Sequence, residues 1–188
     1  MRTAVLIAAS LSTLSLARTA YAGELDLRLG LQATTTQWPG DTGGGSSLDV
    51  GWWIRSWLGV SFVGKEQYAP VDERIMSYLS VNAIARHRLG PVSIGGAVGI
   101  VHQHEESRTA VMEQPLASLL GVGDGIRHRA GSRAGLSVAL PLRAHAHGAW
   151  FVALELDATA FTEHTRGPQW MTSAGLSVGF SYDFTRAR

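Results

Sequence analysis

The sequence predicts an all-β fold, namely a closed, antiparallel, up-and-down transmembrane β-barrel of eight strands. Three observations support this prediction. Eight segments alternate apolar residues with small or polar ones, the apolar positions carry almost no charge, and the connections between the segments alternate between long and short.

The first 22 residues have the three features of a secretory signal peptide. Met1-Arg2 supplies a positive start, Ala4 to Leu16 forms an apolar run, and Ala20-Tyr21-Ala22 is a small-x-small cleavage site. A membrane anchor needs about 20 apolar residues, and this run ends before Arg18. We therefore expect a signal peptide at 1–22, a barrel at 23–184 and a short C-terminal tail at 185–188.

The composition excludes several classes of protein. The chain has no cysteine, so neither disulfides nor thiolate metal sites are available. Its 16 basic and 15 acidic residues lack the basic excess that nucleic-acid binding requires. A mean hydropathy of +0.07 argues against a multi-helix membrane protein but is compatible with a barrel. We expect no cofactor, and one chain suffices to close the barrel as a monomer.

The strands are predicted from period-2 alternation, because successive side chains of a strand point to opposite faces. In the clearest segment, every second residue from Leu25 to Ala33 is leucine or alanine. The eight predicted strands are residues 24–33, 48–55, 58–65, 75–86, 92–103, 133–142, 150–160 and 173–184.

The order of long and short connections predicts where the loops lie. If both termini lie on the periplasmic side, all the long connections face outward. Pro141 fits poorly inside a strand, so that strand ends at Leu140 or carries a bulge. Residues 116–122 are expected as a short helix or as extended strand tips, and Gly43-Gly44-Gly45 as a mobile loop tip. The long connections are residues 34–47, 64–74, 104–131 and 163–170.

The apolar face is expected to contact lipid and the other face to line the lumen. An eight-stranded lumen is just filled by side chains, which suits glycine and serine. Charges of both signs fall on this face and can neutralise each other in a confined interior. A soluble periplasmic lipocalin-like barrel, with its apolar face inside, is the alternative. The predicted lumen charge network consists of Glu24, Asp26, Arg28, Asp49, Arg55, Arg86, Arg133, Glu155, Asp157 and Asp183.

Aromatic residues gather at the ends of the predicted strands, as in the girdles of membrane barrels. Each alone is compatible with ordinary packing, so the prediction rests on their joint placement. Trp57, Trp150, Tyr182 and Phe184 fall at the periplasmic end, and Trp38 and Trp170 fall at the outer end.

The last strand carries a more specific signal. Leu176, Val178, Phe180, Tyr182 and Phe184 alternate and end in an aromatic residue, which resembles the assembly signal of bacterial outer-membrane barrels. The mature chain resembles the small barrels related to outer-membrane proteins A and X. This resemblance implies export to the outer membrane, handling by the barrel-assembly machinery, and contact with outer-membrane lipids and lipopolysaccharide. In that family the aromatic is usually the last residue, whereas residues 185–188 follow it here.

The histidines invite a metal interpretation, which the sequence alone does not support. His102 and His104 share one face of an extended segment, as do His145 and His147, but a metal site needs three or four ligands. No metal site is therefore predicted. An outer-membrane lipid A hydrolase is the alternative function, because some eight-stranded barrels use histidine, serine and glutamate on their outer surface. The candidate residues are His102, His104, Glu105, Glu106 and Ser107.

A basic stretch in the longest connection suggests a partner. Arginine pairs well with phosphate, so Arg127, Arg129 and Arg133 are candidate contacts to lipopolysaccharide, although a solvated loop is the commoner reason for such a stretch. The leading expectation for function is a non-enzymatic, structural or surface-interaction barrel. An eight-stranded lumen leaves little room for a pore.

Overall fold

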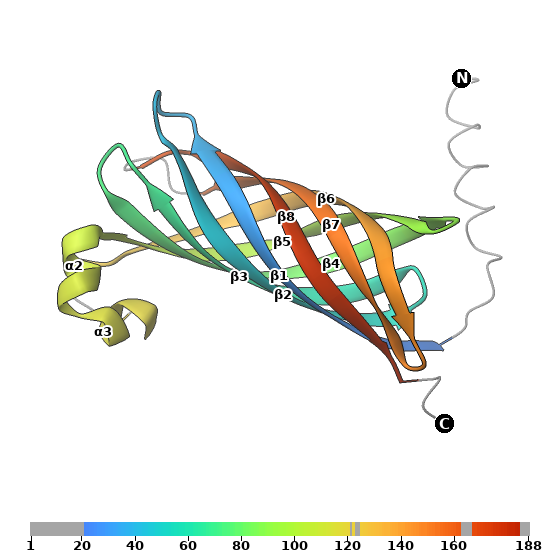
Figure 1. Ribbon diagram of the computed structural model, residues 1–188. Helices are drawn as coiled ribbons and strands as arrows, with labels where there is room; N and C mark the ends of the chain where they lie inside the picture. Colours follow the sequence, from blue (N-terminus) through green and yellow to red (C-terminus); the bar gives the residue numbers. More distant parts are fainter. Residues whose placement is uncertain (1–20, 121, 123–124, 163–166, 185–188) are drawn as a thin grey trace, which may run out of the picture.

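Each strand pairs with its neighbours along the chain, and β8 closes the sheet against β1, as the computed structural model shows (Figure 1). The prediction of a closed, antiparallel, eight-stranded barrel is confirmed. The structure describes residues 21–120, 122, 125–162 and 167–184. The predicted tail 185–188 and residues 1–20 of the predicted signal peptide lie outside these ranges, so both remain predictions.

The strands are longer than the sequence predicts, mainly at the end that carries the long connections. Because the paired strands extend further toward that end, the connection after β1 is only residues 37–41 and the one after β3 only residues 70–73. The elements are β1 Tyr21–Thr36, β2 Thr42–Arg55, β3 Leu58–Ala69, β4 Arg74–Leu89, β5 Val92–Ser107, α2 Arg108–Glu113, α3 Pro115–Leu120, β6 Arg127–His145, β7 Gly148–Phe161 and β8 Trp170–Asp183.

The barrel has two different ends (Figure 1). We call the end with α2, α3 and the connections 37–41, 70–73, 108–126 and 162–169 the loop end. The opposite end, where β1 starts, β8 finishes and the short turns lie, is called the terminal end. Among the described residues, neither helix has the length or apolar run that a membrane-crossing helix needs.

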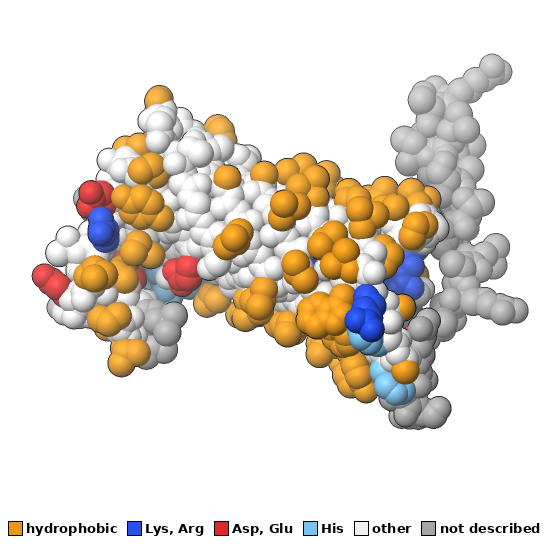
Figure 2. Space-filling view, viewed as in Figure 1, with side chains coloured by type: hydrophobic (Ala, Val, Ile, Leu, Met, Phe, Trp, Pro, Cys, Tyr) orange, Lys and Arg blue, Asp and Glu red, His pale blue; other side chains and the backbone are white. Residues whose placement is uncertain are grey.

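The two faces of the barrel wall differ as the alternation predicts. Leu31 and Ile100 on the outer face expose 73% and 71% of their surface, whereas Asp26 and Asp49 on the inner face expose 7% each. Figure 2 shows hydrophobic side chains spread over the outer wall between the two ends. We call this outward, leucine-rich zone the apolar belt. A soluble barrel that binds an apolar ligand would have the reverse arrangement, with its apolar face inside.

The predicted glycine loop tip is wrong, because Gly43 to Gly45 lie within β2, where all three pair with β1 and Gly44 and Gly45 also pair with β3. Glycine is required there by the close approach of β3. A Cβ on Gly43 would lie 1.6 Å from the carbonyl oxygen of Tyr68, and one on Gly45 would lie 2.0 Å from that of Glu66. These glycines therefore let the strands approach each other and do not provide loop flexibility.

Pro141 stays inside β6, at a register shift between Pro141 and Arg143. Of the two arrangements that the sequence leaves open, the structure shows the bulge, which accommodates a residue without an N–H. The connection before β6 contains two short helices. Ser107 caps the first of them, since its hydroxyl accepts a hydrogen bond from the backbone N–H of Ala110.

Candidate functional site

The lumen near the terminal end holds a cavity of about 360 Å³ surrounded by charged side chains. Arg28 lies between two carboxylates: it pairs with Asp49 and donates to Glu155 Oε1 at 2.8 Å. Ser177 donates to the same Glu155 oxygen at 3.1 Å. Such pairing offsets part of the cost of placing charges away from bulk water.

A second group of charges lies closer to the start of β1. Glu24 pairs with Arg86, which is 7% exposed at its side chain, and also with Arg88. Asp26 accepts a hydrogen bond from the indole N–H of Trp53 at 2.7 Å. The guanidinium of Arg86 stacks over that indole, 4.0 Å from its centroid. Carboxylates and guanidiniums thus alternate around the cavity.

The middle of the lumen is filled by a buried ion pair. Lys65 Nζ lies 2.7 Å from Asp157 Oδ2, and the two side chains are 2% and 4% exposed. Arg133 Nε lies 3.6 Å from the other oxygen of Asp157. Above this pair, the hydroxyls of Tyr78 and Thr159 are hydrogen-bonded at 3.1 Å. Further inward side chains that are almost fully buried, among them Gln67, Met76, Gln103 and Met171, occupy the lumen toward the loop end.

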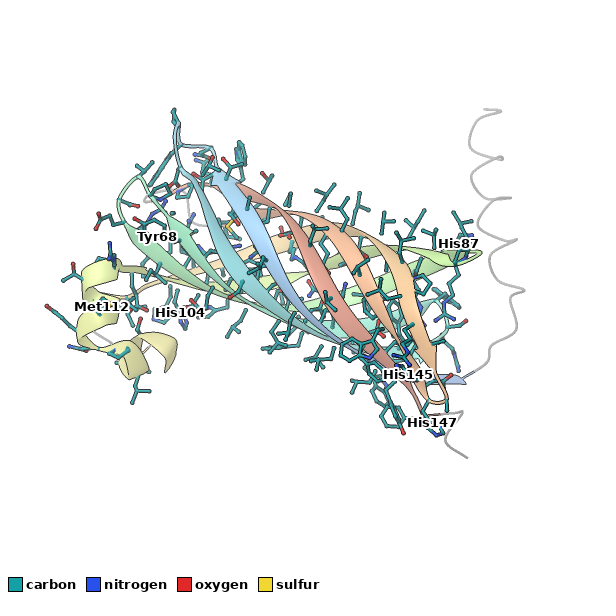
Figure 3. The ribbon with its side chains drawn as sticks, viewed as in Figure 1. Tyr68, His87, His104, Met112, His145 and His147 are labelled. Carbon is teal, nitrogen blue, oxygen red and sulfur yellow. The ribbon has the colours of Figure 1, made fainter. Side chains whose placement is uncertain are left out.

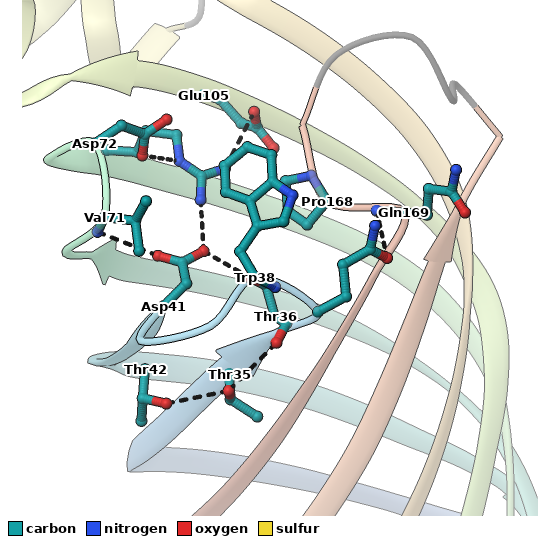
Figure 4. A network of polar contacts seen from close by, with 12 residues as sticks. Thr35, Thr36, Trp38, Asp41, Thr42, Val71, Asp72, Glu105, Pro168 and Gln169 are labelled. Carbon is teal, nitrogen blue, oxygen red and sulfur yellow. Dashed lines mark hydrogen bonds and ion pairs between the residues drawn. The ribbon is translucent and has the colours of Figure 1, made fainter.

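The loop end is tied together by a network that the sequence analysis missed (Figure 4). Asp41 in the first connection accepts from Arg74 at 2.7 Å, from Thr36 at 2.6 Å and from the backbone N–H of Val71 at 3.4 Å. Arg74 also pairs with Asp72 and lies 3.7 Å from Glu105 of β5. One carboxylate and one guanidinium therefore join the connections 37–41 and 70–73 to the barrel wall.

Glu105 extends this network to β6 and to the connection before β8. It pairs with Arg127 at 3.2 Å and with Arg129 at 2.8 Å, and it accepts from Gln103 at 2.8 Å. Arg129 donates to the carbonyl of Pro168 and stacks 3.9 Å from the ring centroid of Phe161. Three of the loop-end connections, 37–41, 70–73 and 162–169, are thus anchored to charges at the mouth of the lumen.

The structure separates the three arginines that were candidates for contacting lipopolysaccharide. The side chain of Arg129 is fully buried, and Arg133 is 8% exposed and lies inside the lumen. Only Arg127, 36% exposed at its side chain, reaches the surface. Arg129 and Arg133 therefore point into the lumen and away from any lipid outside the wall, whereas Arg127 lies at the rim of the lumen mouth, where it pairs with Glu105.

Two members of the predicted lumen network lie at the terminal end of the barrel. Arg55 is half-buried at the end of β2 and makes no ion pair within the described ranges. Asp183 lies opposite Glu24 in the register between β1 and β8. The other eight members lie on the inward-facing positions described above.

Three of the predicted interface aromatics, Trp150, Tyr182 and Phe184, lie in two groups of stacked rings at the terminal end. Tyr182 and Phe184 stack with ring centroids 4.7 Å apart, and Phe184 also contacts Trp52 at 5.5 Å. Trp150 packs against Phe180 at 5.1 Å. Exposed indoles lie at both ends, with Trp57 46% and Trp170 47% exposed.

Trp38 differs from the other predicted interface residues. Its ring covers the guanidinium of Arg74, 4.7 Å from the centroid, inside the loop-end network (Figure 4). The side chain is therefore used to pack against a charge at the mouth of the lumen.

The outer wall at the loop end carries a second polar group. His102 and His104 on β5 and His128 on β6 face outward, two or more residues beyond Ile100, the last apolar belt position on β5. The Nε2 atoms of His102 and His104 lie 2.8 Å apart, and His128 Nδ1 lies 3.3 Å from His102 Nε2. Burial, followed by the two neighbouring imidazoles, lowers the pKa of His104.

The candidate hydrolase residues are divided between the two faces of the wall. Glu105 faces the lumen, Ser107 caps α2, and Glu106 faces outward, where it accepts a hydrogen bond from Ser118 of α3. His128 and Ser118 were not predicted to join these residues, because both follow β5 in the chain. The position of His128 follows only from the pairing of β5 with β6, and that of Ser118 only from the contact of α3 with Glu106.

Comparisons with known proteins support the fold alone. No protein-family model and no curated protein matches the chain. Among solved structures, Neisserial surface protein A has a TM-score of 0.57 at 12% identity and covers 86% of this chain and 96% of its own. Ail, the attachment invasion locus protein of Yersinia pestis, has a TM-score of 0.52 at 15% identity, with 86% and 99% covered. The outer membrane enzyme PagL has a TM-score of 0.50 at 14% identity, with 82% and 97% covered.

These neighbours share one architecture but include both an attachment protein and an enzyme, so the fold does not specify an activity. The closed topology, the outward apolar belt and the charged lumen agree with that architecture. The chain therefore has the fold of a small, eight-stranded outer-membrane β-barrel.

Proposed function

We propose that this protein is a non-enzymatic, non-conducting barrel of the bacterial outer membrane whose loop end contacts lipopolysaccharide in the outer leaflet. It would be exported by its signal peptide, inserted by the barrel-assembly machinery and remain a monomer. The observation that carries the proposal is the division of the molecule into a lumen whose middle and loop-end mouth are filled with paired charges and an outer wall that is apolar between the two ends.

The filled lumen supports a structural role over transport. The pair Lys65–Asp157 and the hydrogen-bonded Tyr78 occupy its middle, and the network around Glu105 occupies its mouth. An ion that crossed would have to displace several buried, paired side chains. We therefore expect no stable conductance in planar bilayers.

The loop-end helices support contact with lipid. Met112 and Leu116 expose 75% and 76% of their surface, and α3 is held against the outer wall through Ser118 and Glu106. Glu106 lies beyond Ile100, the last apolar belt position of β5, so α3 lies on the head-group side of the belt. Arg127, partly exposed at the rim of the lumen mouth and paired there with Glu105, is the one guanidinium of the three candidates that a phosphate outside could also reach.

Binding of lipopolysaccharide to refolded protein in detergent tests this proposal. The double variant Met112→Ser/Leu116→Ser removes apolar area at the loop end and should weaken binding. Leu142→Ser is the matched control, because Leu142 is 60% exposed but lies near the terminal end. Equal affinity of wild type and the Met112→Ser/Leu116→Ser variant would remove the proposed contact.

A lipid A hydrolase is the second candidate, because Glu106, Ser118 and His104 share the outer wall and PagL has this fold. The hydroxyl of Ser118 donates to Glu106 and not to an imidazole, so the contact between nucleophile and base that such chemistry requires is not made. Release of fatty acid from purified lipid A, lost in Ser118→Ala, would favour the hydrolase over the leading proposal.

A further inference from the structure

We propose that His102, His104 and His128 form a binding site for one divalent transition-metal ion on the outer wall of the barrel at the loop end. Each imidazole offers one ligating nitrogen, and these three atoms all lie within 4.8 Å of one another. The site joins β5 to β6, since His104 and His128 are directly paired across the two strands. It goes beyond the proposed contact with lipopolysaccharide and does not depend on it.

The distances between the nitrogens fit a metal centre. In a tetrahedral site with Zn–N bonds of about 2.0–2.1 Å, ligating nitrogens lie roughly 3.3 Å apart. The nitrogens of His102 and His128 lie 3.3 Å apart, and those of His102 and His104 lie 2.8 Å apart. The third separation, between His104 and His128, is within 4.8 Å, so rotations of the rings that bring all three separations to about 3.3 Å would admit the ion.

The rings are already gathered without the ion. The three pairs of imidazole centroids are separated by 4.6, 4.7 and 5.4 Å. His104 is only 8% exposed, and its Nδ1 has no hydrogen-bond partner among the described atoms. An ion bound through Nδ1 would satisfy that atom, whereas one bound through Nε2 would not, so the unpartnered Nδ1 shows that this ring is not committed there to another described protein group.

The charges around the cluster also favour a cation. Glu106 lies close enough to interact electrostatically with His104 and with Glu66. Within the described part of the chain, neither glutamate forms an ion pair. Glu66 accepts a hydrogen bond from Ser77, and Glu106 accepts one from Ser118. Glu106, a carboxylate without a basic partner next to His104, therefore favours a cation at the cluster, and Glu66 adds a second negative charge beyond Glu106.

The donor set selects the class of ion. Imidazole nitrogens suit Zn²⁺, Cu²⁺ and Ni²⁺, whereas Mg²⁺ and Ca²⁺ prefer oxygen ligands. Three histidines leave the fourth position of a tetrahedral ion open to water or another external ligand. Because His102 and His128 are exposed, that position faces outward and is reachable from solvent.

Binding would have a structural consequence for the longest connection. Residues 108–126 leave the barrel from β5 and return to it at β6, and the three histidines lie on the outer wall at the base of this connection. An ion held by both strands would cross-link that base. Figure 3 shows His104 beside the loop-end helices and far from His145 and His147 at the terminal end.

The test uses untagged full-length protein, refolded in detergent after treatment with a chelator, with Zn²⁺ for calorimetry and Co²⁺ as a spectroscopic probe. We expect one ion per chain and the intense visible bands of a tetrahedral Co²⁺ complex. His128→Gln, which changes an exposed side chain, should weaken Zn²⁺ binding at least about tenfold, since even loss of an outer-shell partner costs 10–100-fold.

The second histidine pair is a matched control. His145→Gln/His147→Gln removes two histidines with the same spacing and should leave the stoichiometry and the Co²⁺ spectrum unchanged. Heat-modifiable gel migration verifies that each variant is folded. Zn²⁺ should also slow proteolysis of the connection 108–126 in wild type but not in His128→Gln.

Two results would overturn the proposal. One is Zn²⁺ affinity in folded wild type no greater than in folded His128→Gln. The other is a Co²⁺ spectrum abolished by His145→Gln/His147→Gln and retained in His128→Gln.

Discussion

The buried pair between Lys65 and Asp157 offers a direct test of how the lumen stabilises the barrel. In Lys65→Met the apolar part of the side chain is kept and the charge is removed. Asp157 then loses a partner at 2.7 Å in a site where both side chains are less than 5% exposed. Breaking a buried ion pair from one side costs about 3–5 kcal/mol, because a charge is left without compensation.

The remaining partner sets where in that range the value should fall. Arg133 stays 3.6 Å from Asp157, so we expect a loss of about 3 kcal/mol in the free energy of unfolding, the lower end of the range. At 1.4 kcal/mol per factor of ten, the folded-to-unfolded ratio should fall roughly a hundredfold. In the Lys65→Met background, Asp157→Asn should lower the free energy of unfolding by less than it does in wild type, since there it removes a charge that has lost its lysine partner.

The measurement is urea unfolding of the protein refolded into phospholipid vesicles, followed by tryptophan fluorescence. Arg88→Met is the control, because Arg88 pairs with Glu24 but its side chain is 57% exposed, and exposed pairs are worth only about 0–1 kcal/mol. The reasoning is refuted if Lys65→Met unfolds at the same urea concentration as Arg88→Met.

Three further changes test the outer wall, the strand packing and the loop end. Leu29→Arg, near the middle of the belt, should lower the free energy of unfolding in vesicles by about 2–4 kcal/mol, whereas Leu142→Arg, near the terminal end, should lower it by at most about 1 kcal/mol. Equal losses for the two variants would contradict the lipid-facing belt. Gly43→Ala should destabilise the barrel by roughly 1–3 kcal/mol in the same urea assay, because its Cβ would lie 1.6 Å from a carbonyl oxygen of β3. The Cβ of Gly44→Ala would lie 3.5 Å from its nearest atom, so this variant should be tolerated. A larger loss of stability in Gly44→Ala than in Gly43→Ala would exclude this packing. Arg129→Gln should speed proteolytic cleavage of the loop-end connections while the barrel core stays resistant, and an unchanged cleavage pattern would show that the network does not hold the loops.

Period-2 alternation predicts most of the barrel because it follows from local geometry. Leu25, Leu27 and Leu29 must share a face in any strand, and lipid on one side with a narrow lumen on the other decides which face is outside. The inward positions of Asp26 and Asp157 follow from the same rule. The ends of the strands cannot be predicted from this rule, because beyond the belt the outward residues are polar like the inward ones and the sequence no longer alternates.

The glycines show why the loop lengths were overestimated. Gly43-Gly44-Gly45 has the composition of a flexible tip, and composition alone does not reveal that a neighbouring strand passes within contact of the backbone. The loop-end network was missed for the same reason. Asp41, Arg74 and Glu105 come from three separate parts of the chain, and only the closed barrel brings them to one mouth.

The histidine cluster depends on the register between β5 and β6, which the sequence constrains without determining. A shift by one residue would move every apolar side chain of β6 to the lumen, so only shifts by two are compatible with the belt. His128 faces His104 in the observed register, and it would face His102 or Glu106 in the two nearest registers shifted by two residues. The observed register also places Glu105 opposite Arg127 and next to Arg129, so that one buried carboxylate meets two guanidiniums. Charge pairing inside the lumen thus disfavours the register in which His128 faces His102, because Glu105 would then face Gly125, and it is satisfied in the register that gathers three imidazoles on the outside.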